Sequence, residues 1–234
     1  MNIIAFDTSS QVLSAALLTD SGVWCTDVDA ESSHSELLME CADWLCKTAG
    51  IGSRNLSGAA CMKGPGSFTG LRIGFSAAKG LALALKIPLY AVPTLDCMAY
   101  HLSAWPGLVL PSLDAKKSCF FAALYSHGKR LSGDMDAEGR EIARCIHEAQ
   151  PCQTAPMILT GPGSELLYSV LGPYFSAEKL YIDAESRRGR ARDLLEIIKS
   201  NENMPDSINS GPVYLRKSDA ELKWEESQYH EKGY

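Results

Sequence analysis

The sequence lacks the patterns that mark most catalytic and metal sites. No two of its eight cysteines are spaced as CxxC, its five histidines form neither HxxxH nor HExxH, and no serine lies in GxSxG. A zinc or iron site needs three or four converging ligands, and a hydrolytic nucleophile needs a recognisable setting. A metal site and a hydrolytic triad are therefore not expected, and the cysteines are predicted to be reduced, buried thiols.

Basic charge and long apolar runs are also scarce. The net charge is −6 and the isoelectric point about 5.4, which argues against a chain that holds nucleic acid by itself, because such binding depends on a positive surface. The N-terminus has no basic segment, and Asp7 interrupts its apolar run early. Lys79 and Lys86 break the best candidate for a membrane helix, which needs about 18 apolar residues. The sequence predicts a cytoplasmic protein with no membrane contact.

The sequence does contain two similar halves. Residues 3–6 are typical of a buried strand that ends at Asp7, and residues 107–113 of one that ends at Asp114. The tetrapeptide GPGS begins at Gly64 and again at Gly161. These echoes predict a duplicated βαβ unit. The expected division is an N-terminal lobe over residues 1–103, a C-terminal lobe over 104–210, and a C-terminal segment with a polar tail over 211–234.

Two helices are predicted in the first half. Residues 34–49 form one, with Ser33 and Glu36 as a capping box, and its apolar residues cover roughly 220° of the helical wheel. A helix that lies on one sheet needs an apolar arc of only about 100°, so this helix is expected to be buried against two surfaces. Residues 71–85 form the second helix, whose many glycines and alanines allow another helix to approach closely.

The run GPGSFTGLRIG at residues 64–74 lies between a predicted strand and the second helix. Its spacing fits neither GxGxxG nor a Walker A loop. Two interpretations stay open, an anion-binding turn and a tight turn that starts a helix. The cluster after the first strand likewise fits a phosphate-facing loop or a simple strand end. The candidate nucleotide-binding residues are Asp7, Thr8, Ser9, Gly64, Gly66 and Ser67.

These segments together resemble one family. The order IIAFDTS, HSELL, GPGSFTGLRIG and AKGLA, followed by Asp114-Ala115-Lys116 and PVYLR near the end, is similar to that of the TsaB (YeaZ) family over nearly the whole chain. The GPGSFTGLRIG block is the specific part. Two positions depart from the family pattern, Glu40 in place of a common proline and Lys116 in place of a common arginine.

The resemblance implies an actin-like ATPase (ASKHA, ribonuclease H-like) fold with two lobes and mixed sheets. It also implies a non-catalytic part in making N6-threonylcarbamoyladenosine at position 37 of tRNAs that read codons beginning with A. The partners would be a TsaD-like catalytic subunit and a TsaE-like ATPase, with tRNA met only through the complex. The resemblance leaves open ATP or ADP at the partner interface, and a homodimer in place of the heterodimer.

In that family the first two helices form the dimer interface, which agrees with the wide apolar arc of the first helix and the small residues of the second. The implied interface residues are His34, Leu37, Leu38, Cys41, Trp44, Leu45, Arg72, Ile73, Gly74, Ala77, Ala78 and Leu81. Two other functions remain as alternatives, a free-standing ATPase or kinase of the same fold and a glycoprotease-like hydrolase. For the hydrolase the sequence supplies no nucleophile and no metal pair.

Overall fold

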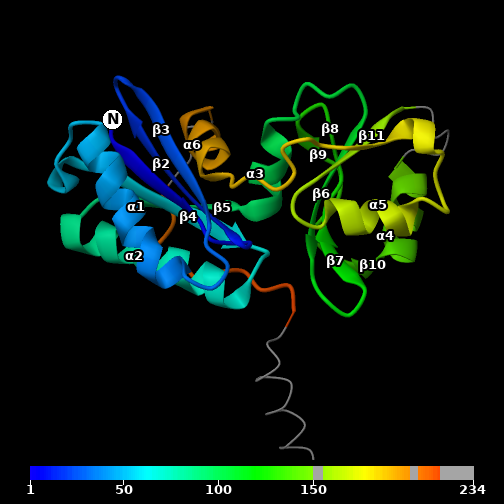
Figure 1. Ribbon diagram of the computed structural model, residues 1–234, viewed down its shortest axis with the longest axis horizontal. Helices are drawn as coiled ribbons and strands as arrows, with labels where there is room; N and C mark the ends of the chain where they lie inside the picture. The colour runs from blue at the N-terminus through cyan, green and yellow to red at the C-terminus, as the bar shows by residue number, and fades with distance from the viewer. Residues whose placement is uncertain (150–154, 201–204, 217–234) are drawn as a thin grey trace, which may run out of the picture.

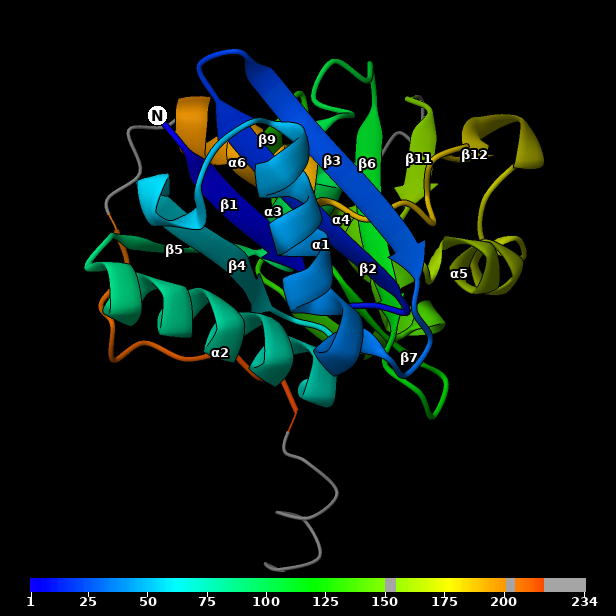
Figure 2. The ribbon, with the colours of Figure 1, turned by 60° about the vertical axis from the view of Figure 1, so that its left-hand side comes forward.

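The computed structural model describes residues 1–149, 155–200 and 205–216 (Figure 1). Cys152 and the predicted polar tail from Asp219 onward lie outside the described residues. Within the described part, two β-sheets stand side by side and each carries helices on its faces (Figures 1 and 2). No helix in these ranges is long and apolar enough to cross a membrane.

The first sheet has the strand order β3-β2-β1-β4-β5. Strand β2 runs antiparallel to its neighbours β1 and β3, and β4 and β5 run parallel to β1. The strands are β1 Ile3–Asp7, β2 Val12–Thr19, β3 Gly22–Asp29, β4 Gly58–Gly64 and β5 Leu89–Pro93, and the helices are α1 His34–Thr48, α2 Phe68–Leu85 and α3 Thr94–Tyr100, with a 3-10 turn at Ser53–Asn55.

The second sheet repeats this order as β10-β7-β6-β11-β12, again with an antiparallel and a parallel half. Its strands are β6 Leu108–Asp114, β7 Cys119–Ala122, β10 Met135–Glu138, β11 Met157–Thr160 and β12 Leu180–Ile182, with a side hairpin of β8 Tyr125–Ser126 and β9 Lys129–Arg130. Its helices are α4 Gly139–Ala149 and α5 Ser164–Leu171, with a 3-10 turn at Ala177–Lys179. The chain then continues into α6 Ala191–Ser200. The predicted duplicated, two-lobed α/β fold with mixed sheets is therefore confirmed.

Alternation along the strands explains why both faces of each sheet are covered. On β1, Ile4 and Phe6 face the helices α1 and α2, whereas Ile3 and Ala5 face α6. In the second sheet, α4 and α5 cover one face and α3 the other. Helices α3 and α6 pack together at the junction between the two sheets. Helix α6 lies on the first sheet although residues 104–210 were expected to form the second lobe.

Several predicted boundaries change for local reasons. Ser33 makes no side-chain cap bond and has φ −93° and ψ 20°, not the extended conformation that lets a cap side chain turn back. The predicted capping box with Glu36 is therefore wrong. Helix α2 begins at Phe68, three residues before the prediction, because the Ser67 hydroxyl accepts a hydrogen bond from the Gly70 N–H.

Candidate functional site

Asp7 ends β1 at the junction between the lobes and is only 1% exposed. Its Oδ1 accepts hydrogen bonds from the Ser9 N–H at 2.9 Å and the Ser9 hydroxyl at 2.6 Å. Its Oδ2 accepts one from the Arg190 N–H at 2.9 Å. Both carboxylate oxygens are therefore engaged by the chain itself, so the buried charge is compensated without a ligand.

The glycine-rich turn before α2 closes onto the loop after β1. The Ser67 N–H donates to the Ser9 carbonyl at 2.9 Å, and the Thr8 hydroxyl donates to the Gly70 carbonyl at 2.7 Å. A Cβ at Gly66 would lie 2.8 Å from the Ser9 oxygen, and one at Gly70 1.9 Å from the Thr8 oxygen. The glycines permit close backbone packing at this point.

The structure thus brings most of the predicted nucleotide-binding residues into contact. Asp7, Thr8 and Ser9 use their side-chain oxygens within the chain. Gly64 has φ 110°, and a Cβ there would lie 2.3 Å from the carbonyl oxygen of Val213. The turn therefore serves backbone packing and a helix start. Nucleotide binding at these residues stays a prediction.

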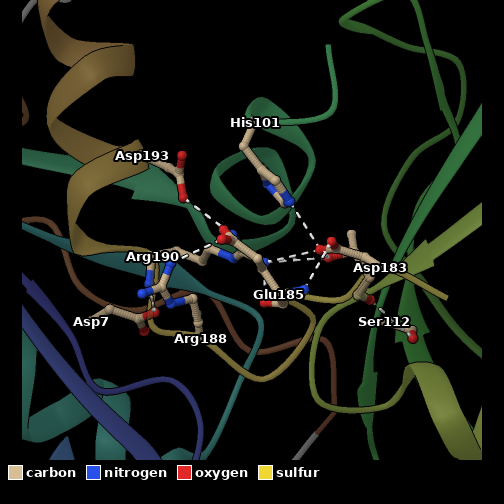
Figure 3. Close-up of polar contacts among 9 residues, drawn as sticks. Asp7, His101, Ser112, Asp183, Glu185, Arg188, Arg190 and Asp193 are labelled. Atoms are coloured by element: carbon tan, nitrogen blue, oxygen red, sulfur yellow. Dashed lines mark hydrogen bonds and ion pairs between the residues drawn. The ribbon is translucent and has the colours of Figure 1, made fainter. Parts of the chain in front are cut away.

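Arg190 is the centre of a buried polar network that joins the two lobes (Figure 3). Its side chain is 3% exposed, and its Nη2 lies 2.8 Å from the Glu185 carbonyl and 3.3 Å from Asp183 Oδ2. Nη2 also lies 3.4 Å from the Thr160 hydroxyl, and Nη1 lies 3.5 Å from Asp193. Because Asp193 is on α6 and Thr160 ends β11, one guanidinium links the first sheet's helix to the second sheet.

Two carboxylates in this network have opposite pKa shifts. Burial favours a higher pKa for Asp183, but hydrogen bonds from Thr160, the Glu185 N–H and His101 outweigh it and hold the pKa below its usual range. Burial raises the pKa of Asp193, and the nearby Arg190 charge only partly opposes that effect. His101, at the end of α3, lies 2.9 Å from Asp183 through Nε2.

No pattern in the sequence identified the residues of this network. Its members are scattered over α3, β11, the segment after β12 and α6, and no spacing rule connects them. The one available signal is the run Arg187-Arg188-Gly189-Arg190-Ala191-Arg192, which is unusual in an acidic chain. A Cβ at Gly189 would lie 2.1 Å from Ser14 Cβ, so this glycine lets the run reach β2 closely enough to insert Arg190.

The equivalent aspartate of the second lobe is arranged differently. Asp114, at the end of β6, has a side chain that is 35% exposed, and it accepts from the N–H and the ammonium of Lys116 at 2.7 and 2.8 Å. The Lys116 side-chain hydrogen bond lowers the pKa of this carboxyl despite an opposing burial effect. No group of three or more His, Cys, Asp or Glu residues within the described ranges could hold a metal ion.

The predicted interface residues fall into two groups. His34, Leu38, Leu45, Gly74 and Ala78 are buried inside the chain. Leu37, Cys41, Ile73, Ala77 and Leu81 are half-buried, and Trp44 and Arg72 are exposed. A Cβ at Gly74 would lie 2.4 Å from the Thr8 hydroxyl, so the small size of Gly74 is required by the β1 loop rather than by the approach of a second helix.

A shallow groove runs between α1 and α2. It is lined by Ser35, Leu38, Met39, Thr69, Arg72, Ile73, Ser76 and Ala77. Met39 is 47% exposed and Trp44 52% exposed on the same helix. The wide apolar arc of α1 thus exceeds what the sheet covers. Met39 remains on the surface at the groove, and Trp44 remains on the surface elsewhere on the helix.

Comparisons with known proteins agree on one family. A family model described as TsaD, tRNA N6-adenosine threonylcarbamoyltransferase, matches residues 22–158, more than half of the chain. The tRNA threonylcarbamoyladenosine biosynthesis protein TsaB of Bacillus subtilis is 29% identical over 97% of this chain and 100% of that protein. TsaB of Escherichia coli is 29% identical over 70% of this chain and 72% of its own.

The chain is also similar to an enzyme and to a solved structure. A tRNA N6-adenosine threonylcarbamoyltransferase of Nitratidesulfovibrio vulgaris is 36% identical, over 59% of this chain and 38% of its own. The solved structure of YeaZ from Pseudomonas aeruginosa shares the fold with a TM-score of 0.75 at 24% identity, covering 92% of this chain and 99% of that one. The chain belongs to the TsaB (YeaZ) family, within the wider family that the TsaD model describes.

Proposed function

We propose that this chain is the non-catalytic partner subunit of a complex that installs the threonylcarbamoyl group on N6 of adenosine 37 in tRNAs reading codons that begin with A. A TsaD-like subunit performs the transfer, and a TsaE-like ATPase joins the assembly. A part in tRNA threonylcarbamoyladenosine biosynthesis comes with the family. The non-catalytic role and the two partners are the proposed steps.

The state of Asp7 carries the non-catalytic part of this proposal. In the actin-like fold a ligand-binding site is expected in the crevice beyond the carboxyl ends of the strands. Here both carboxylate oxygens of Asp7 are hydrogen-bonded to Ser9 and Arg190, and the Arg190 guanidinium fills the junction between Asp183 and Asp193. Three of the roughly four acceptor positions of this carboxylate are taken by the chain's own N–H and O–H groups, which disfavours a metal–nucleotide at Asp7.

The groove between α1 and α2 supports the partner part. Obligate interfaces are more apolar than ordinary surfaces and use aromatic anchors. Met39 is an exposed apolar side chain at the groove, and Ile73 and Ala77 add further apolar lining. Trp44 is an exposed aromatic residue on the same helix, outside the groove lining. We assign this surface to the TsaD-like subunit, and a homodimer through the same surface is the competing assembly. The acidic net charge of −6 agrees with tRNA contacts supplied mainly by partners.

Reconstitution tests the proposal directly. The purified chain is mixed with a TsaD-like subunit, a TsaE-like ATPase, ATP, threonine, bicarbonate, the enzyme that supplies threonylcarbamoyl-adenylate, and unmodified tRNA. Modified nucleoside is measured by mass spectrometry. We expect product only when this chain is present, and no product from this chain without the TsaD-like subunit. Undiminished product in its absence contradicts the proposal.

A further inference from the structure

The described C-terminal segment, residues 205–216, runs along α2 and crosses from the first lobe to the second (Figure 2). We call it the C-terminal strap. Asp206 pairs with Leu89 at the edge of the first sheet and binds the Lys63 ammonium at 2.9 Å. Arg216, at the far end, binds Asp136 of β10 through two nitrogens. The C-terminal strap is therefore anchored at Asp206 and Arg216, which restricts the position of the residues between them.

Tyr214 lies between these anchors and stacks on the first residue of α2. Its ring centroid is 4.2 Å from that of Phe68, and the two planes differ by 3°. The Tyr214 hydroxyl accepts a hydrogen bond of 3.0 Å from Arg72 Nε. The Arg72 guanidinium carbon lies 5.5 and 5.7 Å from the Phe68 and Tyr214 ring centroids. Two aromatic rings and one hydroxyl thus restrict the orientation of Arg72.

Arg72 is also the one charged residue among those that line the groove between α1 and α2. Its Nε is bonded to Tyr214, and its two Nη nitrogens have no hydrogen-bond or ion-pair partner among the described residues. A planar guanidinium with two free Nη groups matches a carboxylate in a bidentate manner. The other lining residues are apolar or hydroxyl-bearing, so the groove is complementary to an apolar surface that carries one acidic side chain.

We propose that Tyr214 is a positioning residue, by which the C-terminal strap holds Arg72 ready to bind a carboxylate on the TsaD-like partner. This inference rests on the proposed function. A free arginine side chain loses much rotamer entropy when it is ordered by a partner. Ordering it beforehand against Tyr214 and Phe68 removes that cost from the binding step, which strengthens binding without a new contact. The strap thereby makes the C-terminal segment a determinant of an interface formed by α1 and α2.

The test is the dissociation constant between the full-length chain and the TsaD-like subunit, measured by calorimetry at several salt concentrations. We expect Arg72→Gln to weaken binding about tenfold, in line with loss of a charged hydrogen-bonded pair. We expect Tyr214→Ala to weaken it to a similar extent and to reduce the salt dependence, because Arg72 is no longer oriented. The double variant should bind no more weakly than Arg72→Gln alone. Tyr214→Phe, which keeps the stacking, should weaken binding about threefold.

Tyr181→Ala is the matched control, because Tyr181 lies on β12 and is 45% exposed. Its hydroxyl donates to the Glu178 carbonyl and its ring packs edge-on against Trp105, neither of which belongs to the groove. It should bind as the wild type does. The inference is overturned if Tyr214→Ala binds like the wild type, or if its effect adds fully to that of Arg72→Gln with an unchanged salt dependence. If Tyr214→Ala does not fold, Tyr214→Phe decides by the same comparison. A wild-type chain that does not bind at all overturns the proposed function instead.

Discussion

The two lobes share one chain path, yet their outer helices present different surfaces. The groove between α1 and α2 has an apolar half, Leu38, Met39, Ile73 and Ala77, three hydroxyl-bearing residues, Ser35, Thr69 and Ser76, and one charged residue, Arg72. Trp44 is exposed on the same helix, outside the groove lining. The corresponding helix of the second lobe, α4, borders a hollow lined mainly by charged and polar groups, namely Arg140, Ala143, Arg144, His147, Glu148 and Tyr174. Burial of the inner faces is needed in both lobes, so the fold is the same. The outward residues differ, and this difference is why we propose the first lobe as the partner surface.

A second difference concerns the aspartates that end β1 and β6. Asp7 is buried and bonded to Ser9 and Arg190, whereas Asp114 is partly exposed and pairs with Lys116 beside it. Equivalent positions in the repeat thus perform different tasks. Asp7 holds the lobes together through Arg190, and Asp114 shapes a surface loop in which Lys116, Lys117 and Ser118 all have positive φ.

Replacing Arg190 by alanine should have the largest effect, because it leaves Asp183 and Asp193 buried without their cation. Loss of one partner of a buried ion pair costs about 3 to 5 kcal/mol of unfolding free energy. Urea denaturation of Arg190→Ala measures it. Arg188→Ala is the control, because Arg188 and Glu185 are 65% and 52% exposed and such pairs contribute at most about 1 kcal/mol. Equal stability of the two variants would contradict the role of Arg190.

Replacing Trp44 by glutamate tests whether the partner binds the outer surface of the first lobe rather than that of the second. An exposed aromatic side chain that a partner covers can contribute about 2 kcal/mol or more, so binding to the TsaD-like subunit should weaken at least about 30-fold if the interface extends over this face of α1. Leu166→Glu on α5 is the matched control, because Leu166 is 50% exposed in the second lobe against 52% for Trp44. Pull-down and calorimetry measure both. Similar losses for the two variants would place the partner elsewhere.

Asp7→Asn and Asp114→Asn compare the two strand-end carboxylates directly. The first removes a charge-assisted acceptor from the Ser9 and Arg190 N–H groups and should cost about 2 kcal/mol of unfolding free energy. The second removes a largely exposed pair with Lys116 and should cost less than about 1 kcal/mol. Thermal and chemical denaturation check both values. If Asp114→Asn proves the more destabilising, the second lobe and not the first carries the structural aspartate.

The smallest expected effect is on acid stability. The folded-state pKa of Asp183 lies below the unfolded value, so the unfolded chain binds more protons and stability falls as pH falls below about 4. Asp183→Asn should flatten this decline between about pH 4 and the folded-state pKa, measured as unfolding free energy against pH. High salt should leave the wild-type decline in place, because the side chain of Asp183 is 8% exposed and buried pairs are little screened. A decline abolished by salt would locate its origin on the surface.

Local pattern was enough to predict the main elements at the start of the first lobe. Strand β1 and helix α1 fall within about two residues of the predicted ranges, since their alternation and helical period are read within one element. The Ser33 capping box failed because the chain enters α1 in a conformation that no local pattern reveals. The second sheet was predicted less completely. Its strands β9, β10 and β12 have only 2 to 4 residues each, too few to show a period.

Some residues of the candidate site could likewise be predicted from the sequence, and others could not. Asp7, Thr8 and Ser9 were selected because they follow a buried strand, and the structure does place them at the junction. Arg190 could not be selected for its contact with Asp7, since the two are 183 residues apart. Gly74 was assigned to a helix interface by composition, but it is small because Thr8 lies against it.

The sequence by itself determined the duplicated order of strands and helices, the two GPGS turns and the family, because each of these is written in short runs of neighbouring residues. Only the tertiary structure decided how the Asp7 carboxylate is satisfied, which interface candidates remain on the surface, and that Tyr214 meets Arg72 across 142 residues. The physical reason is that the charge and hydrogen-bond partners of a buried group are set by which distant elements pack around it. The spacing of residues along the chain does not show which distant elements will pack around such a group.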